Sequence, residues 1–374
     1  MRPHKVLIPL LVVPALVLAA CTGDDDDDTA EPGIPGETQE TGEAAPEGET
    51  TTDGTLAEVQ NRGVLNCGVN DAVPGFGFLT PEGEYEGFDV EFCRVVAAAV
   101  LGDANAVEFT ALTAEARFTA LQAREVDVLI RNTTWTASRD GGENSSFTTT
   151  TFYDGQGMMV RSDDGYGSLE DMDGTAICVL SGTTTELNLE SVFVSLGLDY
   201  EPLTFEDNDT LREAFLEERC DGWTSDKSQL AGFRATWPED EGGPDALTIL
   251  DETMSKEPLG PVTLDGDTDW FDAVHWAVIS TIQAWEFGID STNVGDFLDV
   301  NPEEDPEIAR FLGVDGFDAG LGLAPDFVVN VLEQVGNYEE IYNRTVGPET
   351  SLGLEPGLNA LWSEGGLLYA PPYR

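Results

Sequence analysis

Hydrophobic and polar positions along the chain predict short buried strands that alternate with amphipathic helices. Apolar runs at residues 64–69, 107–109 and 126–130 are typical of strands. Between them, residues 88–101 and 114–124 carry apolar side chains three or four positions apart, which predicts helices with one buried face. This order is the rhythm of parallel βαβ units.

The same rhythm restarts after Gly174. Strands are expected at 176–180, 202–205, 221–224 and 247–250, and helices at 184–196, 210–219 and 269–287. The pattern therefore predicts two α/β units side by side, and a cleft between two such units favours a small-molecule site. No glycine fingerprint of a dinucleotide or triphosphate site accompanies them.

The first residues have the pattern of an export signal. Arg2 and Lys5 precede a short apolar run, and small residues follow it, so we expect residues 1–20 to be a signal peptide. The order Leu18-Ala19-Ala20-Cys21 resembles a bacterial lipobox, which implies that Cys21 is acylated and anchors the chain to a membrane. The alternative is a plain secretory signal in which this cysteine is accidental.

Charge is distributed unevenly over the 374 residues. There are 72 acidic and 17 basic side chains, giving a net charge of -55, which excludes a nucleic-acid partner because phosphate binding needs clustered Lys and Arg. Residues 21–55 hold Asp24 to Asp28 and seven more acidic residues, no basic residue and little that is apolar. We expect this segment to be a disordered tether, and the folded part to begin near Leu56.

Five cysteines are an odd number for an exported protein. If Cys21 is acylated, Cys67, Cys93, Cys178 and Cys220 remain, and four cysteines allow three pairings that sequence does not decide. Local folding of each half favours Cys67 with Cys93 and Cys178 with Cys220. Four reduced, buried thiols are the alternative, less favoured outside the cytoplasm.

Several ordered stretches resemble the substrate-binding subunits of amino-acid ABC importers, and most closely the general L-amino-acid receptors of broad specificity. They are residues 87–90 (GFDV), 117–122 (RFTALQ), 131–136 (RNTTWT), 139–140 (RD), 153–157 (YDGQG), 182–188 (GTTTELN), 255–261 (SKEPLGP) and 357–362 (GLNALW). The resemblance implies an α/β fold with two hinged lobes, the periplasmic-binding-protein fold of type II. Carried over, one lobe takes residues 56–155 plus 257–374 and the other takes 156–256.

The resemblance also implies where a ligand binds. Arg139 matches the arginine of the family's carboxylate clamp, and a guanidinium suits a bidentate pair. Asp226 matches the carboxylate that holds the amino group, although Lys227 follows it here and could compete as an ion partner. Asn132 and Thr134 match polar contacts from the same lobe as Arg139.

A capping box at residues 183–186 predicts a helix start that can also receive an anion. Thr184 is the hydroxyl that we expect to meet the ligand carboxylate there. Phe76 and Trp135 are candidates to line the pocket for the ligand side chain, with burial in the core as the alternative for either.

We therefore expect an extracytoplasmic, lipid-anchored, monomeric receptor that binds L-amino acids, polar and acidic ones included, and delivers them to an ABC permease. It should use no cofactor and no metal, and it should not be an enzyme. A dehydratase on the same fold is one alternative, with His275 as the one imidazole left after the signal. Calcium-dependent interaction through the acidic run 265–269 is the other.

Overall fold

The computed structural model describes residues 54–373. The expected signal peptide, the acylated Cys21 and almost all of the expected tether lie outside these residues. Helix α1 (Thr55–Arg62) already includes the last tether residue, because the Thr55 amide donates to a carboxylate oxygen of Asp267 at 2.7 Å. Helix α1 therefore starts at Thr55, next to the expected position near Leu56.

The first sheet has five strands in the order β5-β1-β6-β15-β7. Their bounds are β1 Leu65–Val69, β5 Val107–Ala111, β6 Val128–Leu129, β7 Ser145–Phe147 and β15 Val262–Leu264. Strand β1 pairs in parallel with β5 and β6, whereas β15 runs antiparallel to β6 and β7. A last strand from far along the chain thus completes a sheet that begins as βαβ units.

The second sheet repeats this plan in the order β11-β10-β12-β9-β13. Its bounds are β9 Gln156–Arg161, β10 Thr175–Leu180, β11 Tyr200–Phe205, β12 Gly222–Asp226 and β13 Leu247–Ile249. Strand β10 pairs in parallel with β11 and β12, and β9 runs antiparallel to β12 and β13. Both units are therefore mixed sheets with a parallel core.

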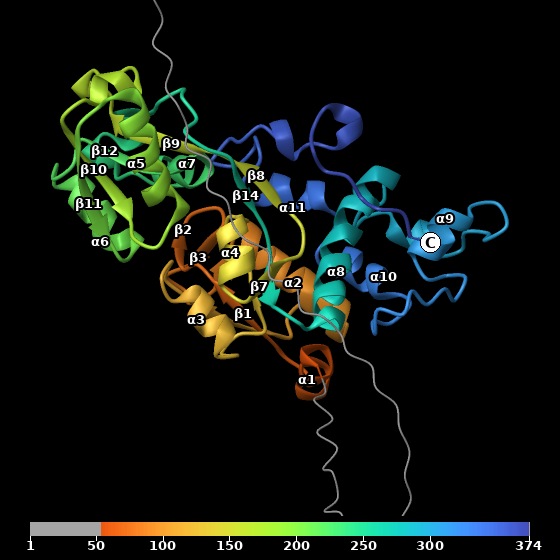
Figure 1. The fold of residues 1–374 in the computed structure, drawn as a ribbon. Coiled ribbons are helices and arrows are strands. Elements are labelled where there is room, and N and C mark those ends of the chain that lie inside the picture. Colours follow the sequence, from red (N-terminus) through yellow and green to blue (C-terminus); the bar gives the residue numbers. More distant parts are fainter. Residues whose placement is uncertain (1–53, 374) are drawn as a thin grey trace, which may run out of the picture. The chain divides into compact units, whose positions relative to one another are not determined.

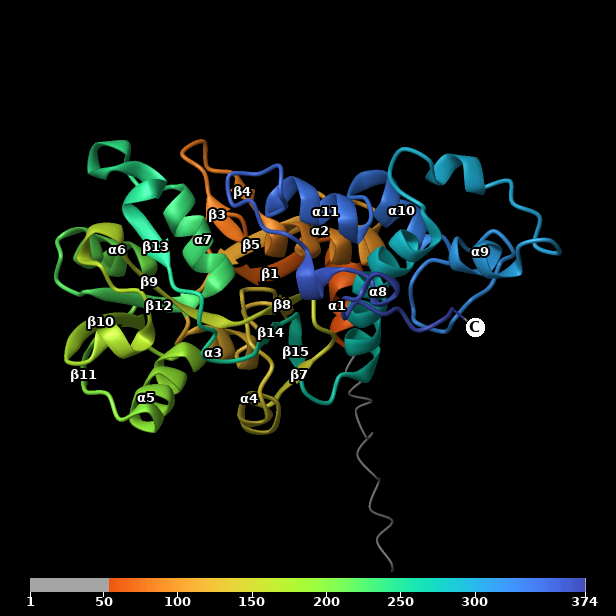
Figure 2. The ribbon, with the colours of Figure 1, turned by 90° about the horizontal axis from the view of Figure 1, so that it is seen from above.

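Two short antiparallel strands, β8 (Phe152–Asp154) and β14 (Glu257–Leu259), carry the chain between the sheets. Figures 1 and 2 both draw them between the two groups of elements. Gly155 separates β8 from β9, and a Cβ there would collide with the side chain of Thr253 on the returning segment. The two crossings can approach each other this closely only with glycine at 155.

A separate small sheet joins β2 (Ala72–Val73), β3 (Gly77–Leu79) and β4 (Tyr85–Glu86).

Helices cover both sheets. The helices beside the first sheet are α2 Phe88–Leu101, α3 Arg117–Gln122, α4 Ala137–Gly142, α8 Thr268–Phe287, α10 Phe327–Gln334 and α11 Tyr338–Thr345. Helix α9 (Pro306–Phe311) follows α8 in sequence and lies at the outer end of this group, near the C-terminus (Figure 2). The second sheet is covered by α5 Thr184–Leu196, α6 Asn208–Leu216 and α7 Lys227–Ala235. Helix α2 is more deeply buried than its predicted single apolar face, because α8, α10 and α11 pack around it and eleven of its fourteen residues are buried.

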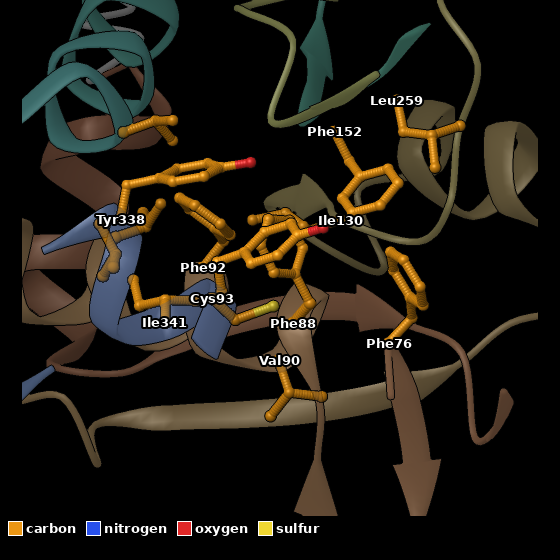
Figure 3. Packing of buried hydrophobic residues seen from close by; sticks show 14 of the residues in the cluster. Phe76, Phe88, Val90, Phe92, Cys93, Ile130, Phe152, Leu259, Tyr338 and Ile341 are labelled. Atoms are coloured by element: carbon orange, nitrogen blue, oxygen red, sulfur yellow. The ribbon is translucent and has the colours of Figure 1, made fainter. Parts of the chain in front are cut away.

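An aromatic cluster fills the core beside the first sheet (Figure 3). The rings of Phe76 and Phe88 lie 5.1 and 5.5 Å from that of Phe152 on β8. Tyr342 stacks on Phe152 at 6.1 Å. These contacts attach the first crossing strand firmly to the core beside the first sheet.

Two disulfides, Cys67–Cys93 and Cys178–Cys220, join cysteines whose Cα atoms are 6.1 and 5.7 Å apart. This is the pairing that local folding favours, one bond for each α/β unit. Within residues 54–373, no helix has the length and apolar character needed to cross a bilayer.

Candidate functional site

A pocket lies where the parallel strands of the two sheets end. Its lining comes from both sides: α3, α4 and the segment after β6 beside the first sheet, and β10, β12 and the start of α5 in the second unit. The space between these side chains is about 370 Å³, counting the part open to solvent. Its position suits a ligand, since the carboxyl ends of strands are where ligands bind in open α/β sheets.

Three buried guanidiniums line this pocket, Arg117, Arg131 and Arg139. Each donates to a backbone carbonyl: Arg117 to Gly182 at 3.3 Å, Arg131 to Leu112 at 2.7 Å and Arg139 to Thr134 at 2.9 Å. The Nε of Arg117 has no hydrogen-bond partner although it is buried. A buried donor without a partner gains a hydrogen bond when an anion binds beside it.

Burial lowers the pKa of all three arginines. The pKa of Arg131 falls to about 10, and that of Arg117 falls well below its ordinary value, with the neighbouring guanidinium of Arg139 adding to the effect of burial. For Arg139, Glu257 and Asp226 partly offset the cost of burial. Three concentrated positive charges make the pocket strongly attractive to a carboxylate.

Asp226 brings a carboxylate into the same pocket at the end of β12. It is 5% exposed, and its Oδ1 is buried without a hydrogen-bond partner. Burial raises the pKa of this carboxyl well above its ordinary value, and the carboxylates of Asp154 and Glu257 raise it further. The guanidiniums of Arg139 and Arg117 lower this pKa without outweighing burial. Asp226 is therefore an acceptor that lacks a cationic donor.

Lys227 does not take that role. Its Nζ donates to the backbone carbonyl of Asp251 at 2.8 Å, which points the ammonium away from Asp226. The competition suggested by the sequence is absent because the Lys227 side chain runs past Gly157 of β9 to the Asp251 carbonyl. Asp226 thus remains available to a ligand.

Asn132 lies among the arginines with a left-handed backbone, φ +39°, which asparagine tolerates better than most residues. Its backbone amide donates to Asp89 at 2.7 Å, and its side-chain oxygen accepts from Asn70 at 3.3 Å. Its Nδ2 is buried without a partner. Burial also raises the pKa of Asp89 to about 7. The unusual turn at Asn132 therefore presents one more unsatisfied donor to the pocket.

Thr134 and Thr184 meet across the pocket, with 3.3 Å between their hydroxyl oxygens. Thr183 caps α5 by accepting from the Glu186 amide at 3.1 Å, while the first-turn N–H groups of α5 have no intrahelical acceptors. The Thr184 hydroxyl donates to Glu257 at 2.8 Å, so its proton is already committed in this structure. The helix start still offers N–H groups and the positive end of its dipole.

Two residues expected in the side-chain pocket lie elsewhere. Phe76 is fully buried in the aromatic cluster (Figure 3). Its backbone is held at the start of α2, because the Phe88 and Asp89 amides donate to the carbonyls of Gly75 and Phe76. Trp135 is 41% exposed and stacks on Phe147 at 5.9 Å, outside the pocket lining. Phe76 thus takes the alternative of burial in the core, and Trp135 lies at the surface outside this pocket.

The pocket also includes residues that sequence reasoning did not select, among them Arg117, Arg131, Asn70, Ser225 and Gln229. Both arginines lie in stretches that carry the family resemblance. Because basic residues are scarce in this chain, these two arginines could have been selected as candidates from the sequence. The polar residues gave no signal, since each is ordinary by itself.

The alternatives find no support at the pocket. His275 lies on α8, where its ring stacks on Phe271 and its Nδ1 lies 2.8 Å from the Thr148 carbonyl. In the acidic run, Asp267 caps α8 by accepting from the Trp270 amide at 3.2 Å. Among residues 54–373, no three His, Cys, Asp or Glu side chains are placed to share a metal ion.

Comparison with known proteins gives consistent results. The sequence model of the family "Bacterial extracellular solute-binding proteins, family 3" matches residues 65–344. The chain is 45% identical over 323 residues to the general L-amino acid-binding periplasmic protein AapJ of Rhizobium johnstonii, covering 86% of this chain and 93% of the relative. It is 44% identical over 322 residues, with the same coverage, to the glutamate/glutamine/aspartate/asparagine-binding protein BztA of Rhodobacter capsulatus.

Among solved structures, an ABC transporter periplasmic binding protein from Brucella ovis with glutathione bound superposes with a TM-score of 0.82. The two sequences are 43% identical, and the superposition covers 86% of this chain and 99% of the Brucella chain. The expected two-lobe periplasmic-binding-protein fold and the family resemblance are both confirmed. The chain belongs to the bacterial extracellular solute-binding proteins of family 3.

Proposed function

We propose that this protein captures L-amino acids outside the cytoplasm and delivers them to an ABC importer. The observation that carries the proposal is the pairing, in one buried pocket, of three guanidiniums with an unpartnered carboxylate oxygen on Asp226. An α-amino acid presents the complementary pair, a carboxylate and an ammonium. The names of the Rhizobium and Rhodobacter relatives support the same ligand class.

The carboxylate of the ligand is proposed to lie between Arg139 and the backbone N–H groups of the first turn of α5. Arg139 has one guanidinium nitrogen committed to Thr134, which orients the remaining donors. The ammonium is proposed to meet Asp226, with the Asn132 and Thr134 side chains as further polar contacts. Because these groups bind the carboxylate and the ammonium, which all amino acids share, the site suits several amino acids, polar and acidic ones included.

Ligand capture is proposed to close two lobes about the crossing strands. One lobe comprises residues 56–155 plus 257–374, and the other residues 156–256, with Gly155 and the segment before Glu257 at the crossings. The contacts of Arg117 with Gly182 and of Thr134 with Thr184 join the two lobes, which supports a closed arrangement. A ligand touching both lobes shifts the population toward this closed form.

We further propose that the mature chain is a monomeric lipoprotein anchored through Cys21, and that it performs no chemistry on its ligand. Labelling of cells with a radioactive fatty acid tests the anchor, because a Cys21→Ser variant should lose the label and leave the membrane fraction. If the variant retains the label, the proposal of a lipid anchor at Cys21 is contradicted, and the proposed binding function is unaffected.

A thermal-shift screen against the common L-amino acids tests the binding function. At a ligand concentration of 100 times Kd, binding adds about 2.7 kcal/mol to the free energy of unfolding. For a chain of this size that is a rise in Tm of about 5 °C. Absence of a shift with every L-amino acid, or chemical conversion of one of them, refutes the proposal.

A further inference from the structure

Glu257 is a buried carboxylate that sits behind the pocket and not in its lining. It lies on β14, is 1% exposed, and pairs in register with Asp154 of β8. Its two oxygens accept hydrogen bonds from the Thr184 hydroxyl at 2.8 Å, from Nδ2 of Asn188 at 2.8 Å, and from the Ser255 hydroxyl. A carboxylate with three donors acts only as an acceptor.

This arrangement fixes the direction of a short hydrogen-bond chain. A threonine hydroxyl has one proton, and that of Thr184 is directed to Glu257. In the contact between the two threonines, at 3.3 Å, Thr134 must therefore be the donor. Both hydroxyls that border the pocket have then committed their protons, and they offer a ligand only lone pairs.

Acceptors at this place suit one end of an amino acid and not the other. An ammonium group has three N–H donors, and it gains from hydroxyl lone pairs beside the unpartnered Oδ1 of Asp226. A second carboxylate, or a hydrogen atom in place of the ammonium, gains nothing from them. Glu257 also adds negative charge near Asp226, as its effect in raising the pKa of that carboxyl indicates.

Resting on the proposed function, we infer that Glu257 is a positioning residue for specificity: by taking the proton of Thr184, it sets Thr184 and Thr134 as acceptors for the α-ammonium of the ligand. It thereby favours amino acids over analogues without the amino group. In a Glu257→Gln variant, the amide can donate to Thr184, and the threonine protons become free to turn into the pocket.

Titration calorimetry with L-glutamate and with glutarate, which is glutamate without its amino group, tests this inference. Wild type should prefer L-glutamate, and Glu257→Gln should reduce that preference at least about tenfold while its glutarate affinity stays equal or rises. Ser255→Ala is the matched control, because it removes one donor to Glu257 and leaves the Thr184 contact; its preference should stay within about twofold of wild type. L-alanine with propionate is the second ligand pair, for a pocket that favours small amino acids.

A merely structural role lowers the affinities of both ligands equally, and that result overturns the inference. If Glu257→Gln does not fold, Thr184→Val should show the same loss of preference, and Thr184→Ser should retain it. If wild type binds glutarate too weakly to measure, an undiminished L-glutamate affinity in Glu257→Gln overturns the inference. Wild type that binds no L-amino acid refutes the proposed function instead.

Discussion

Asp226→Asn is expected to weaken ligand binding and, at the same time, to stabilise the ligand-free protein. The substitution keeps the shape of the side chain and removes its charge. Asp226 is buried at the end of β12 with one carboxylate oxygen unpartnered, so its charge has a cost without ligand and a use with ligand. The two effects should have opposite signs.

The loss of affinity follows from the buried charge pair with the ligand ammonium. Removing one member of such a pair costs about 2 to 5 kcal/mol. At about 1.4 kcal/mol for each factor of ten, Kd should rise about 30- to 3,000-fold. All amino acids should be affected, because all present the same ammonium.

The gain in stability follows from the raised pKa of the Asp226 carboxyl. A group with a raised pKa in the folded state stabilises the fold below its ordinary pKa, and this contribution is lost as pH rises through the raised value. At neutral pH the charged form is therefore a burden that asparagine relieves. A buried, unsatisfied charged group costs more than a neutral one by about 1 kcal/mol or more, so Tm of the ligand-free variant should rise by about 2 °C or more.

Thermal melts without ligand and titration calorimetry with L-glutamate measure the two effects. Asp240→Asn is a suitable control, because Asp240 is exposed and lies in a short turn of 3-10 helix outside the pocket lining. It should change neither quantity. An Asp226→Asn variant that melts below wild type without ligand refutes the reasoning about burial, and one that keeps wild-type affinity refutes the ammonium assignment.

Four further outcomes are expected. Arg139→Ala should lower the affinity for all amino acids alike, by about ten- to a hundredfold in calorimetry; a loss confined to one side-chain class contradicts the carboxylate assignment. Burial raises the pKa of Asp89 to about 7, so its stabilising effect is complete below about pH 4 and is lost as pH rises through 7. Asp89→Asn should therefore flatten the fall of Tm over that range, and an unchanged profile contradicts the raised pKa of Asp89. Replacing Cys178 and Cys220 by serine should lower the free energy of unfolding by about 4 kcal/mol in denaturant titrations, because the bond closes a loop with a sequence separation of 42; an unchanged free energy of unfolding contradicts this. With a net charge of -55, Tm should rise on adding salt, and a flat response argues against charge repulsion as a burden on the fold.

Local sequence signals predicted the regular elements well. Helices α2 and α5 have the predicted bounds, because left-handed glycines, Gly102 and Gly197, end both of them and Thr183 caps the second. Helix α3 is shorter than predicted at both ends, and β6 is reduced to two residues. Short elements such as these are decided by tertiary contacts and not by periodicity.

The site was only partly predictable, for a physical reason. Arg139, Asn132, Thr134, Thr184 and Asp226 were selected and all lie at the pocket. Glu257 was missed, since its role depends on a helix some seventy positions earlier in the chain. For Phe76 the sequence left core and pocket open, because an aromatic beside glycines suits either, and only the packing of α2 and β8 decides between them.

The aromatic cluster has a practical consequence for measuring closure. Phe152 is held by three rings. If the two lobes close as proposed, β8 should move as one body with the core beside the first sheet, and the rotation should begin after it, at Asp154 and Gly155. A fluorescent dye at the exposed start of α8, on Asp269, would then mark the part that does not move. A second dye on Val194 of α5, which is 69% exposed, would travel with the moving lobe. Energy transfer between them would turn the protein into an optical sensor for its own ligand.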